Sequence, residues 1–346
     1  MLPAKKQIIL FLVFTCLIAD LPAQIKDYDT TYYQSFSELI TGRLYFSKKF
    51  TDFTIGGAGV TPDISYRSNT NLNMGVGATY KTFTIGLDYG FGFLNNNDAK
   101  GKTKSIDLQT HIYTREWAID LSGQFYKGYY INKNSIGYPG SESDPYYRRR
   151  DAGITLLGGS VYRIVNSDKF SMRAATLQDE WQQKSAGSIL VGAEIFYGSV
   201  HADSSLVPLL MKDRYQQAGT RKVRLFKFGP GAGYAYTLVY DKHFYFTWCL
   251  SASINAGTVK EIGDSASHTK FNFSPNYTYR FAVGYNGPVW ACNLMLVGNE
   301  INFKGASSPE AYNARTGNVR LNITRRLVPG KKIKEKVQQF ENMINR

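Results

Sequence analysis

Three side chains that lie close together in the sequence could form a nucleophilic group: His111, Asp120 and Ser122. A serine nucleophile needs a histidine to accept its proton and a carboxylate to orient that histidine. In an alternating β-hairpin all three lie on one face, with His111 diagonal to Asp120. That face would point into a barrel lumen among many other polar groups, which favours a hydrogen-bond network. We therefore predict that the protein is not an enzyme, and keep a lipid-modifying enzyme as an alternative.

Other chemical motifs are sparse. The four histidines stand at no spacing from cysteines or carboxylates that suits a transition metal, and no glycine-rich strand–turn–helix marks a phosphate site. We predict no catalytic residue, cofactor or metal. The stretch 173–184 is dense in charged and amide groups, and it is interpreted either as a ligand-contact loop at the mouth of a pore or as a salt-bridged cap on its rim. Its candidate residues are Arg173, Glu180 and Trp181.

Period-two alternation predicts the elements that position these residues. Between 83 and 93 the apolar residues alternate with small or polar ones, so that each kind occupies one face of a strand. A turn at Lys81–Thr82 pairs Tyr80 with Phe83 and places apolar opposite apolar along the whole hairpin. Turns at Thr114–Arg115 and Asn286–Gly287 give the same agreement. They pair Ile112 with Trp117, Leu108 with Leu121, Val283 with Trp290 and Tyr279 with Leu294.

The pattern predicts an all-β protein, an antiparallel transmembrane β-barrel of about 12 strands, with 14 allowed. Aromatic residues make up 14% of the chain and mean hydropathy is −0.29, as expected when apolar side chains alternate with polar ones. Short turns near 81, 114, 166–167, 241 and 286 should face the periplasm, and longer loops near 94–102, 128–151, 257–270 and 299–315 should face outside. The rhythm breaks within 176–222, where the strand number is uncertain.

A membrane barrel turns its apolar face to lipid and its polar face inward, whereas a secreted sandwich would bury the apolar face. We predict the barrel. Arg163 and Arg224 could close its lumen by pairing with Asp88 and Asp120. The candidates for the lumen lining are Asp88, Asp107, Gln109, His111, Asp120, Ser122, Gln124 and Glu194.

The chain is predicted to be exported. Residues 1–23 combine lysines, an apolar run and a small residue before the expected cleavage site, which together indicate a signal peptide. Residues 24–42 would form a periplasmic segment, 43–328 the barrel, and 329–346 a charged, helical tail. The predicted location is the bacterial outer membrane.

Four segments resemble a known family: Ile40–Ser47, Asn69–Tyr80, Gly123–Tyr130 and Arg173–Ser188. Together they are similar to an exported β-rich family of Bacteroidota, catalogued as domain of unknown function 4421. The resemblance covers nearly all of the mature chain. It implies an outer-membrane barrel, and it implies no activity and no site residues.

A formal charge of +14 would suit nucleic acid, but export excludes that partner, and anionic lipid headgroups are the expected contact. Other expected partners are outer-membrane lipid and the barrel-assembly machinery. The favoured function is a passive pore for small polar solutes or a structural membrane component. The alternative is surface binding or adhesion through loops 128–151 and 198–222, with mouth candidates Arg148, Arg149 and Arg150.

Overall fold

The protein consists mainly of long antiparallel strands. The computed structural model describes residues 28–81, 83–91, 98–139, 143–264, 266–307 and 310–344. They divide into a large β unit, Asp29–Leu327, and a second unit that contains α3 (Lys331–Ile344). No helix in the described part of the chain is long and apolar enough to cross a membrane. The predicted signal peptide lies outside the described residues.

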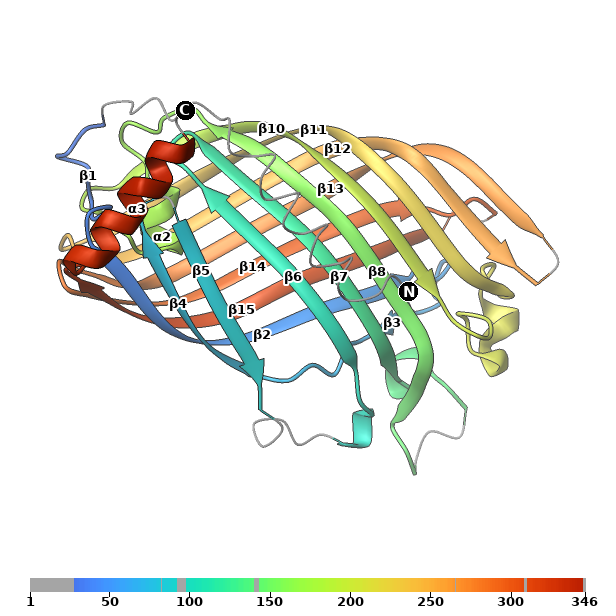
Figure 1. Cartoon of the computed structure of the whole chain (residues 1–346). Helices are drawn as coiled ribbons and strands as arrows, with labels where there is room; N and C mark the ends of the chain where they lie inside the picture. The colour runs from blue at the N-terminus through green and yellow to red at the C-terminus, as the bar shows by residue number, and fades with distance from the viewer. Residues whose placement is uncertain are drawn as a thin grey trace. The chain divides into compact units, whose positions relative to one another are not determined.

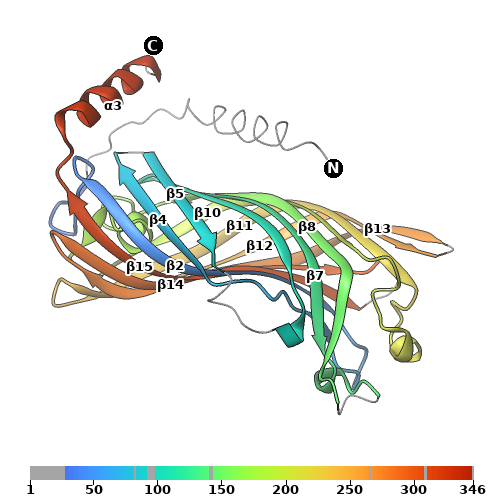
Figure 2. The same cartoon turned by 60° about the horizontal axis from the view of Figure 1, so that its bottom comes forward.

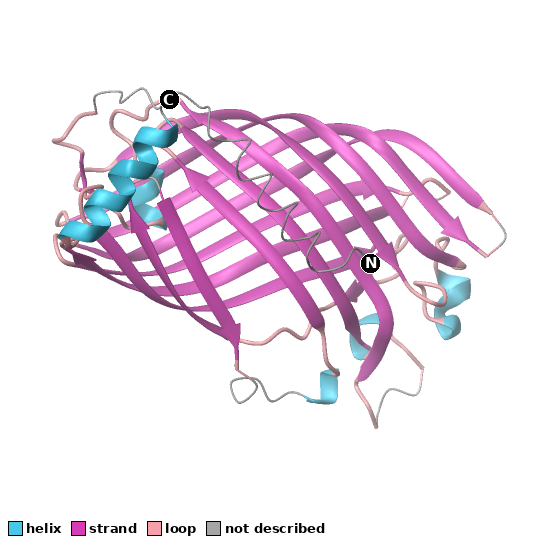
Figure 3. Ribbon diagram, viewed as in Figure 1, coloured by secondary structure: helices cyan, strands magenta, loops and turns pink. Residues whose placement is uncertain are grey.

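The main sheet of the described residues has 13 strands, and 12 of them form the wall. The remaining strand, β3, pairs only with β2 and lies off the path of the others. Their order is β5-β4-β2-β15-β14-β13-β12-β11-β10-β8-β7-β6, with antiparallel neighbours throughout (Figures 1 and 3). This confirms the predicted architecture and strand number. The strands are β2 (Ile40–Ile55), β3 (Ile64–Tyr66), β4 (Asn73–Tyr80), β5 (Phe83–Gly90), β6 (Lys104–Tyr113), β7 (Trp117–Asn132), β8 (Tyr146–Ile164), β10 (Ala186–His201), β11 (Thr220–Tyr240), β12 (Phe244–Gly263), β13 (Ser267–Asn286), β14 (Trp290–Lys304) and β15 (Ala311–Leu327).

The two faces of the wall have opposite polarity. Along β15, Asn322 and Thr324 are at most 2% exposed, whereas Leu321 and Ile323 are about 40% exposed. The same inversion recurs around the sheet, with polar residues inside and apolar residues outside. Since a soluble sandwich would bury the apolar face, this arrangement is that of a membrane barrel.

Three hairpins test the predicted registers. The first is confirmed, with Tyr80 opposite Phe83. In the second, Ile112 pairs with Ile119 instead of Trp117, and in the third Val283 pairs with Leu294 instead of Trp290. Both predictions were wrong by an even number of residues. Such a shift leaves every side chain on its predicted face, so alternation could not detect it.

Two predicted connections were also wrong. Residues 257–270 belong mostly to β12 and β13 and contain no long loop. Residues 166–167 form no simple turn, because they begin a long insertion, 165–185, between β8 and β10. We call this insertion the plug segment. It contains α2 (Met172–Thr176) and β9 (Glu180–Gln182), and β9 pairs with β1 (Tyr33–Ser35).

The barrel thus has two distinct ends. The turn end carries the connections 114–116, 241–243 and 287–289 together with the plug segment. The loop end carries the longer connections, including 202–219 between β10 and β11 and its short helix η4 (Leu209–Arg214). Figure 2 shows the wall from another side, with the short β4–β5 hairpin at one edge of the sheet.

Candidate functional site

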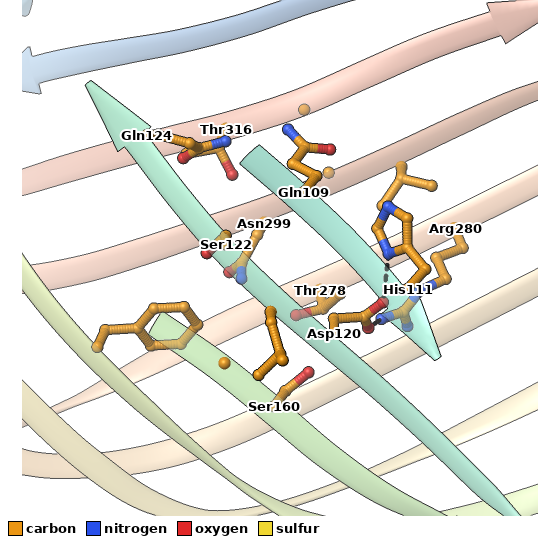
Figure 4. A pocket seen from close by; sticks show the side chains of 16 residues that line it. Gln109, His111, Asp120, Ser122, Gln124, Ser160, Thr278, Arg280, Asn299 and Thr316 are labelled. Atoms are coloured by element: carbon orange, nitrogen blue, oxygen red, sulfur yellow. Dashed lines mark hydrogen bonds and ion pairs between the residues drawn. The ribbon is translucent and has the colours of Figure 1, made fainter. Parts of the chain in front are cut away.

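The centre of the lumen holds a charged group drawn from three strands. His111 on β6 lies directly opposite Asp120 on β7, and the His111 Nδ1 atom is 2.6 Å from the Asp120 Oδ1 atom. Tyr113 donates its hydroxyl to the same carboxylate at 2.9 Å. The guanidinium of Arg280, on β13, donates to the other carboxylate oxygen from across the lumen (Figure 4). Asp120 is therefore balanced by a buried cation and held by two further donors.

A small cavity of about 50 Å³ adjoins this group, and its polar lining comes from several strands (Figure 4). The volume admits only a few water molecules. Four buried polar atoms of the lining have no protein partner: Gln124 Oε1, Thr278 Oγ1, Arg280 Nε and Asn299 Oδ1. Because unsatisfied buried polar atoms are costly, they mark a place for water or for a small polar solute.

Ser122 completes the lining but does not extend the His111–Asp120 pair. It lies opposite Gln109, and its hydroxyl donates to the carbonyl oxygen of Gly158 at 3.4 Å. Among the described residues, no group of three or more histidines, cysteines, aspartates or glutamates is arranged to hold a metal ion.

The other predicted lining residues also point inward. Asp107 accepts from the Tyr126 hydroxyl at 2.5 Å, and Asp88 lies 3.2 Å from the Lys49 Nζ atom. Glu194 accepts from the Tyr162 hydroxyl at 2.7 Å and from the Ser253 hydroxyl at 2.6 Å. Each of these carboxylates thus has at least one donor from a neighbouring part of the wall, although the Asp107 Oδ1 atom is buried without a protein partner.

The plug segment closes the turn end through hydrogen bonds to the rim. Arg173 donates to the carbonyl oxygens of Tyr113 at 2.9 Å and Lys81 at 3.1 Å. Trp181 Nε1 donates to the carbonyl oxygen of Lys242 at 2.7 Å. Asn286, the last residue of β13, donates to the carbonyl oxygen of Glu180 at 2.9 Å. Four separate connections of the barrel are therefore tied to one insertion.

Inner-face side chains hold the same segment from within the wall. Arg43 on β2 donates to the carbonyl oxygen of Leu177 at 2.8 Å, and Asn293 on β14 donates to that of Ala175 at 2.7 Å. Arg326 on β15 donates to that of Gln178 at 2.6 Å. These bonds satisfy carbonyl groups in and just after the last turn of the short helix α2. No further helical turn follows that could donate backbone N–H groups to them.

Three charges are buried inside the plug segment. Arg173 pairs with Asp179 and lies 3.9 Å from Glu180, and both carboxylate side chains are almost fully buried. Ser171 caps α2, since its hydroxyl accepts from the Ala174 amide at 3.0 Å, and it donates to Glu180. Burial raises the pKa of the Glu180 carboxyl above its ordinary value, although the Arg173 guanidinium acts in the opposite direction.

The predicted mouth residues fall at both ends of the barrel. Arg173, Glu180 and Trp181 belong to the turn end, whereas Arg148–Arg150 lie near the start of β8 at the loop end. Arg149 is buried and donates to Asp151, to the Ser205 carbonyl oxygen and to the Tyr66 hydroxyl. Arg148 donates to Asp144 and to the carbonyl oxygen of Ala99. Arg150 is exposed. Arg148 and Arg149 thus stabilise the connections at the loop end by hydrogen bonds.

Sequence reasoning missed the cations that organise the lumen. It considered Arg163 and Arg224, but both lie on the outer, exposed side of their strands. Two inward cations that it missed are Arg280 and Arg326, which alternate with outward residues of β13 and β15. Extending the alternation that placed Asp88 inward along these two strands would have identified them.

The chain is similar to one protein family and to several solved structures. The family model described as "Domain of unknown function (DUF4421)" matches residues 27–326. No curated protein matches the chain. The solved structures that resemble it include the outer membrane protease OmpT from Escherichia coli, with 9% identity and a TM-score of 0.40, over 85% of this chain and 98% of the other. The CymD monoaromatic hydrocarbon channel shares 11% identity with a TM-score of 0.28, over 83% and 88%.

A third structure, outer-membrane expressed OmpT of Vibrio cholerae, shares 9% identity with a TM-score of 0.26, over 82% of this chain and 98% of the other. These likenesses concern the fold alone. The prediction that the protein is not an enzyme was wrong in excluding enzymes as a class, because an outer membrane protease is among the solved structures that resemble this chain. The likeness assigns no activity to its residues.

Proposed function

The chain belongs to the family described as a domain of unknown function (DUF4421), and from that premise we propose that it is a normally closed channel of the outer membrane. Its polar lumen passes small polar solutes when both ends are open, the turn end by release of the plug segment and the loop end by separation of its apolar cluster. The observation that carries this proposal is that both ends of the lumen are closed, and by different means: many hydrogen bonds and a small apolar contact hold the plug segment, whereas a larger apolar cluster fills the loop end.

The middle of the lumen suits polar solutes. Its lining combines amide, hydroxyl and charged groups around the His111–Asp120 pair, and several of these atoms have no protein partner. Such groups replace the hydration of a small polar solute as it passes. An inner core that served only to fill the barrel would be expected to satisfy its own polar atoms.

The plug segment has the properties of a releasable seal. Its polar contacts with the rim are single hydrogen bonds from side chains to backbone carbonyl groups, and its apolar contact with the wall is made mainly by Phe170 and Met172. Each such bond contributes only about 1 kcal/mol net, since water replaces it on release. A segment held in this way can leave without dismantling the wall.

The loop end is closed by apolar packing instead. Phe53, Phe303 and Tyr312 are buried inside the wall, and the ring of Tyr312 stacks on the other two at 5.6 and 5.3 Å. Leu206 and Met211, from the connection 202–219, belong to the same cluster. An apolar constriction of this kind stops water and ions by dewetting.

Single-channel conductance in planar bilayers tests the proposal. Wild type is expected to be silent. We expect conductance steps only when both seals are removed, by replacing residues 169–184 with a short glycine–serine turn and combining this change with Phe53→Ala and Tyr312→Ala. Each seal removed alone should leave the barrel closed, because the other still blocks the lumen.

A matched control removes two rings from the outer face, Phe226→Ala with Phe271→Ala, in the same shortened background. Both side chains face outward, so this variant should stay silent. Folding of each variant is read from gel mobility in SDS before and after boiling. A double-seal variant that remains folded and silent would overturn the channel and leave a structural membrane component.

A further inference from the structure

The wall of the barrel has one seam without backbone pairing. In the described residues β5 pairs only with β4, and β6 pairs only with β7. Yet β5 and β6 are consecutive in the chain and are the two edges of the sheet (Figure 1). In a closed barrel these two edges would pair with each other.

Exposure of the main chain shows that the edge of β5 is open. Every residue from Thr84 to Tyr89 is exposed, on both faces of the strand. Gly86 has no side chain, so its exposure is that of the backbone. The Asp88 side chain is only 22% exposed, and the remaining exposure of that residue also lies on its backbone.

The β4–β5 hairpin resembles a movable leaf. Each of its strands has 8 residues, whereas the other wall strands have 10 to 21. At its turn, Lys81 is bonded to Ser37 and to Arg173 of the plug segment. Along its length the hairpin pairs with β2 only from Thr41 to Ser47, and the Lys49–Asp88 ion pair links its far strand to the same neighbour. A hairpin with so few attachments can move relative to the wall more easily than the long strands on the opposite side.

The seam separates two environments of opposite polarity. Outside, Ile85, Leu87, Ile106 and Leu108 are all exposed apolar residues beside the two edges. Inside, Asp88 on β5 and Asp107 on β6 lie on either side of the seam. Gln109 and His111, further along β6, line the central cavity. Unpaired backbone groups cost several kcal/mol each in hydrocarbon, so polar atoms must meet these edges.

We propose that the seam between β5 and β6 is a lateral gate, through which the polar head of a phospholipid enters the lumen while its acyl chains stay in the bilayer. The head satisfies the edge groups that no strand meets, and the apolar rows on the outer face accompany the chains. The Lys49–Asp88 ion pair places charges of both signs at the inner side of the gate, which suits a zwitterionic head. This inference goes beyond the proposed channel and does not depend on release of the plug segment.

Lipid contact with an inward position tests the gate. The full-length protein, with its cysteines replaced by alanine, receives one new cysteine by Gln109→Cys, which is labelled with bimane. The protein is then placed in phosphatidylcholine vesicles that carry a doxyl quencher near the head of the lipid. We expect strong quenching, within about twofold of that at the neighbouring outer position in Leu108→Cys.

The matched negative control is Asn299→Cys, which lines the same cavity from the opposite wall and should show little quenching. If the label at position 109 is quenched no more than that at position 299, the gate is overturned. Should Gln109→Cys fail to fold, Thr84→Cys on the inner face of β5 serves as the reporter. Quenching is independent of conductance, so failure of either proposal leaves the other standing.

Discussion

Arg326, one residue before the end of the last strand, donates a hydrogen bond of 2.6 Å to the carbonyl oxygen of Gln178 in the plug segment. The same guanidinium donates to the carbonyl oxygen of Gly287 and, at 2.7 Å, to the Asn286 side chain. Thr324 donates to the Gln178 side chain at 2.7 Å. The strand that ends the barrel thus holds both the seal and a neighbouring connection.

Replacing Arg326 is therefore expected to loosen the turn end. Arg326→Lys cannot reach three acceptors from one ammonium group, and the loss should cost roughly 2 to 3 kcal/mol of stability. The temperature at which the unheated gel form converts to the slow form should fall. Arg325→Ala is the control, because that side chain is exposed and lies over the outer Trp290 ring. An equal effect of both variants would contradict the assigned role.

The Asp120–Arg280 pair gives a second prediction. Asp120→Asn leaves a guanidinium buried without its carboxylate, which should cost about 3 kcal/mol. The double variant Asp120→Asn with Arg280→Gln removes both charges, so its cost should be smaller than the sum of the single costs by at least about 1 kcal/mol. Urea unfolding in detergent measures all three variants. Additive costs would mean that the two side chains are not coupled.

Two glycines make a matched pair in the wall. A Cβ atom at Gly192 would lie 1.9 Å from the carbonyl oxygen of Val161 on the adjacent strand, whereas one at Gly42 would meet nothing closer than 3.7 Å. Gly192→Ala must displace backbone, and we expect a cost of roughly 1 to 3 kcal/mol. Gly42→Ala should be neutral. Gel mobility after refolding checks both, and equal refolding yields would contradict the close approach at Gly192.

Much of the wall could be predicted from sequence, because alternation reports the face of each residue directly. It placed Asp120 and Glu194 inside, and the structure agrees. Register was predictable only where the turn was short. The hairpin through Lys81 was right, whereas the one through Asn286 was displaced by an even number of residues. Since such a displacement keeps every face, only turn geometry could have decided it.

The plug segment could not be predicted for a different reason. Its position depends on single side chains far away in the sequence, such as Arg43, Asn293 and Arg326. No local period marks such contacts, because each strand contributes only one or two residues to them. The density of charge in 173–184 indicated a capping role, but the end of the barrel that it caps follows only from the connection between β8 and β10.

The buried carboxyl of Glu180 predicts a pH dependence of the turn end. Burial raises its pKa above the ordinary value of 4.5, so the folded plug segment favours the neutral form. The stability that this group contributes is fully present below pH 4.5 and is lost as the pH rises through the raised value. Glu180→Gln cannot ionise and still offers Ser171 an acceptor, so it should abolish this loss.

The measurement is the temperature of the gel-mobility transition at pH 4 and pH 8, in wild type and in Glu180→Gln. We expect Glu180→Gln to gain stability relative to wild type at pH 8 but not at pH 4. Other carboxyl groups titrate in both proteins, so only the difference between them reports on Glu180. Glu335→Gln removes an exposed carboxyl from α3 and should follow wild type at both values. A constant difference between Glu180→Gln and wild type would show that Glu180 does not change its protonation on folding.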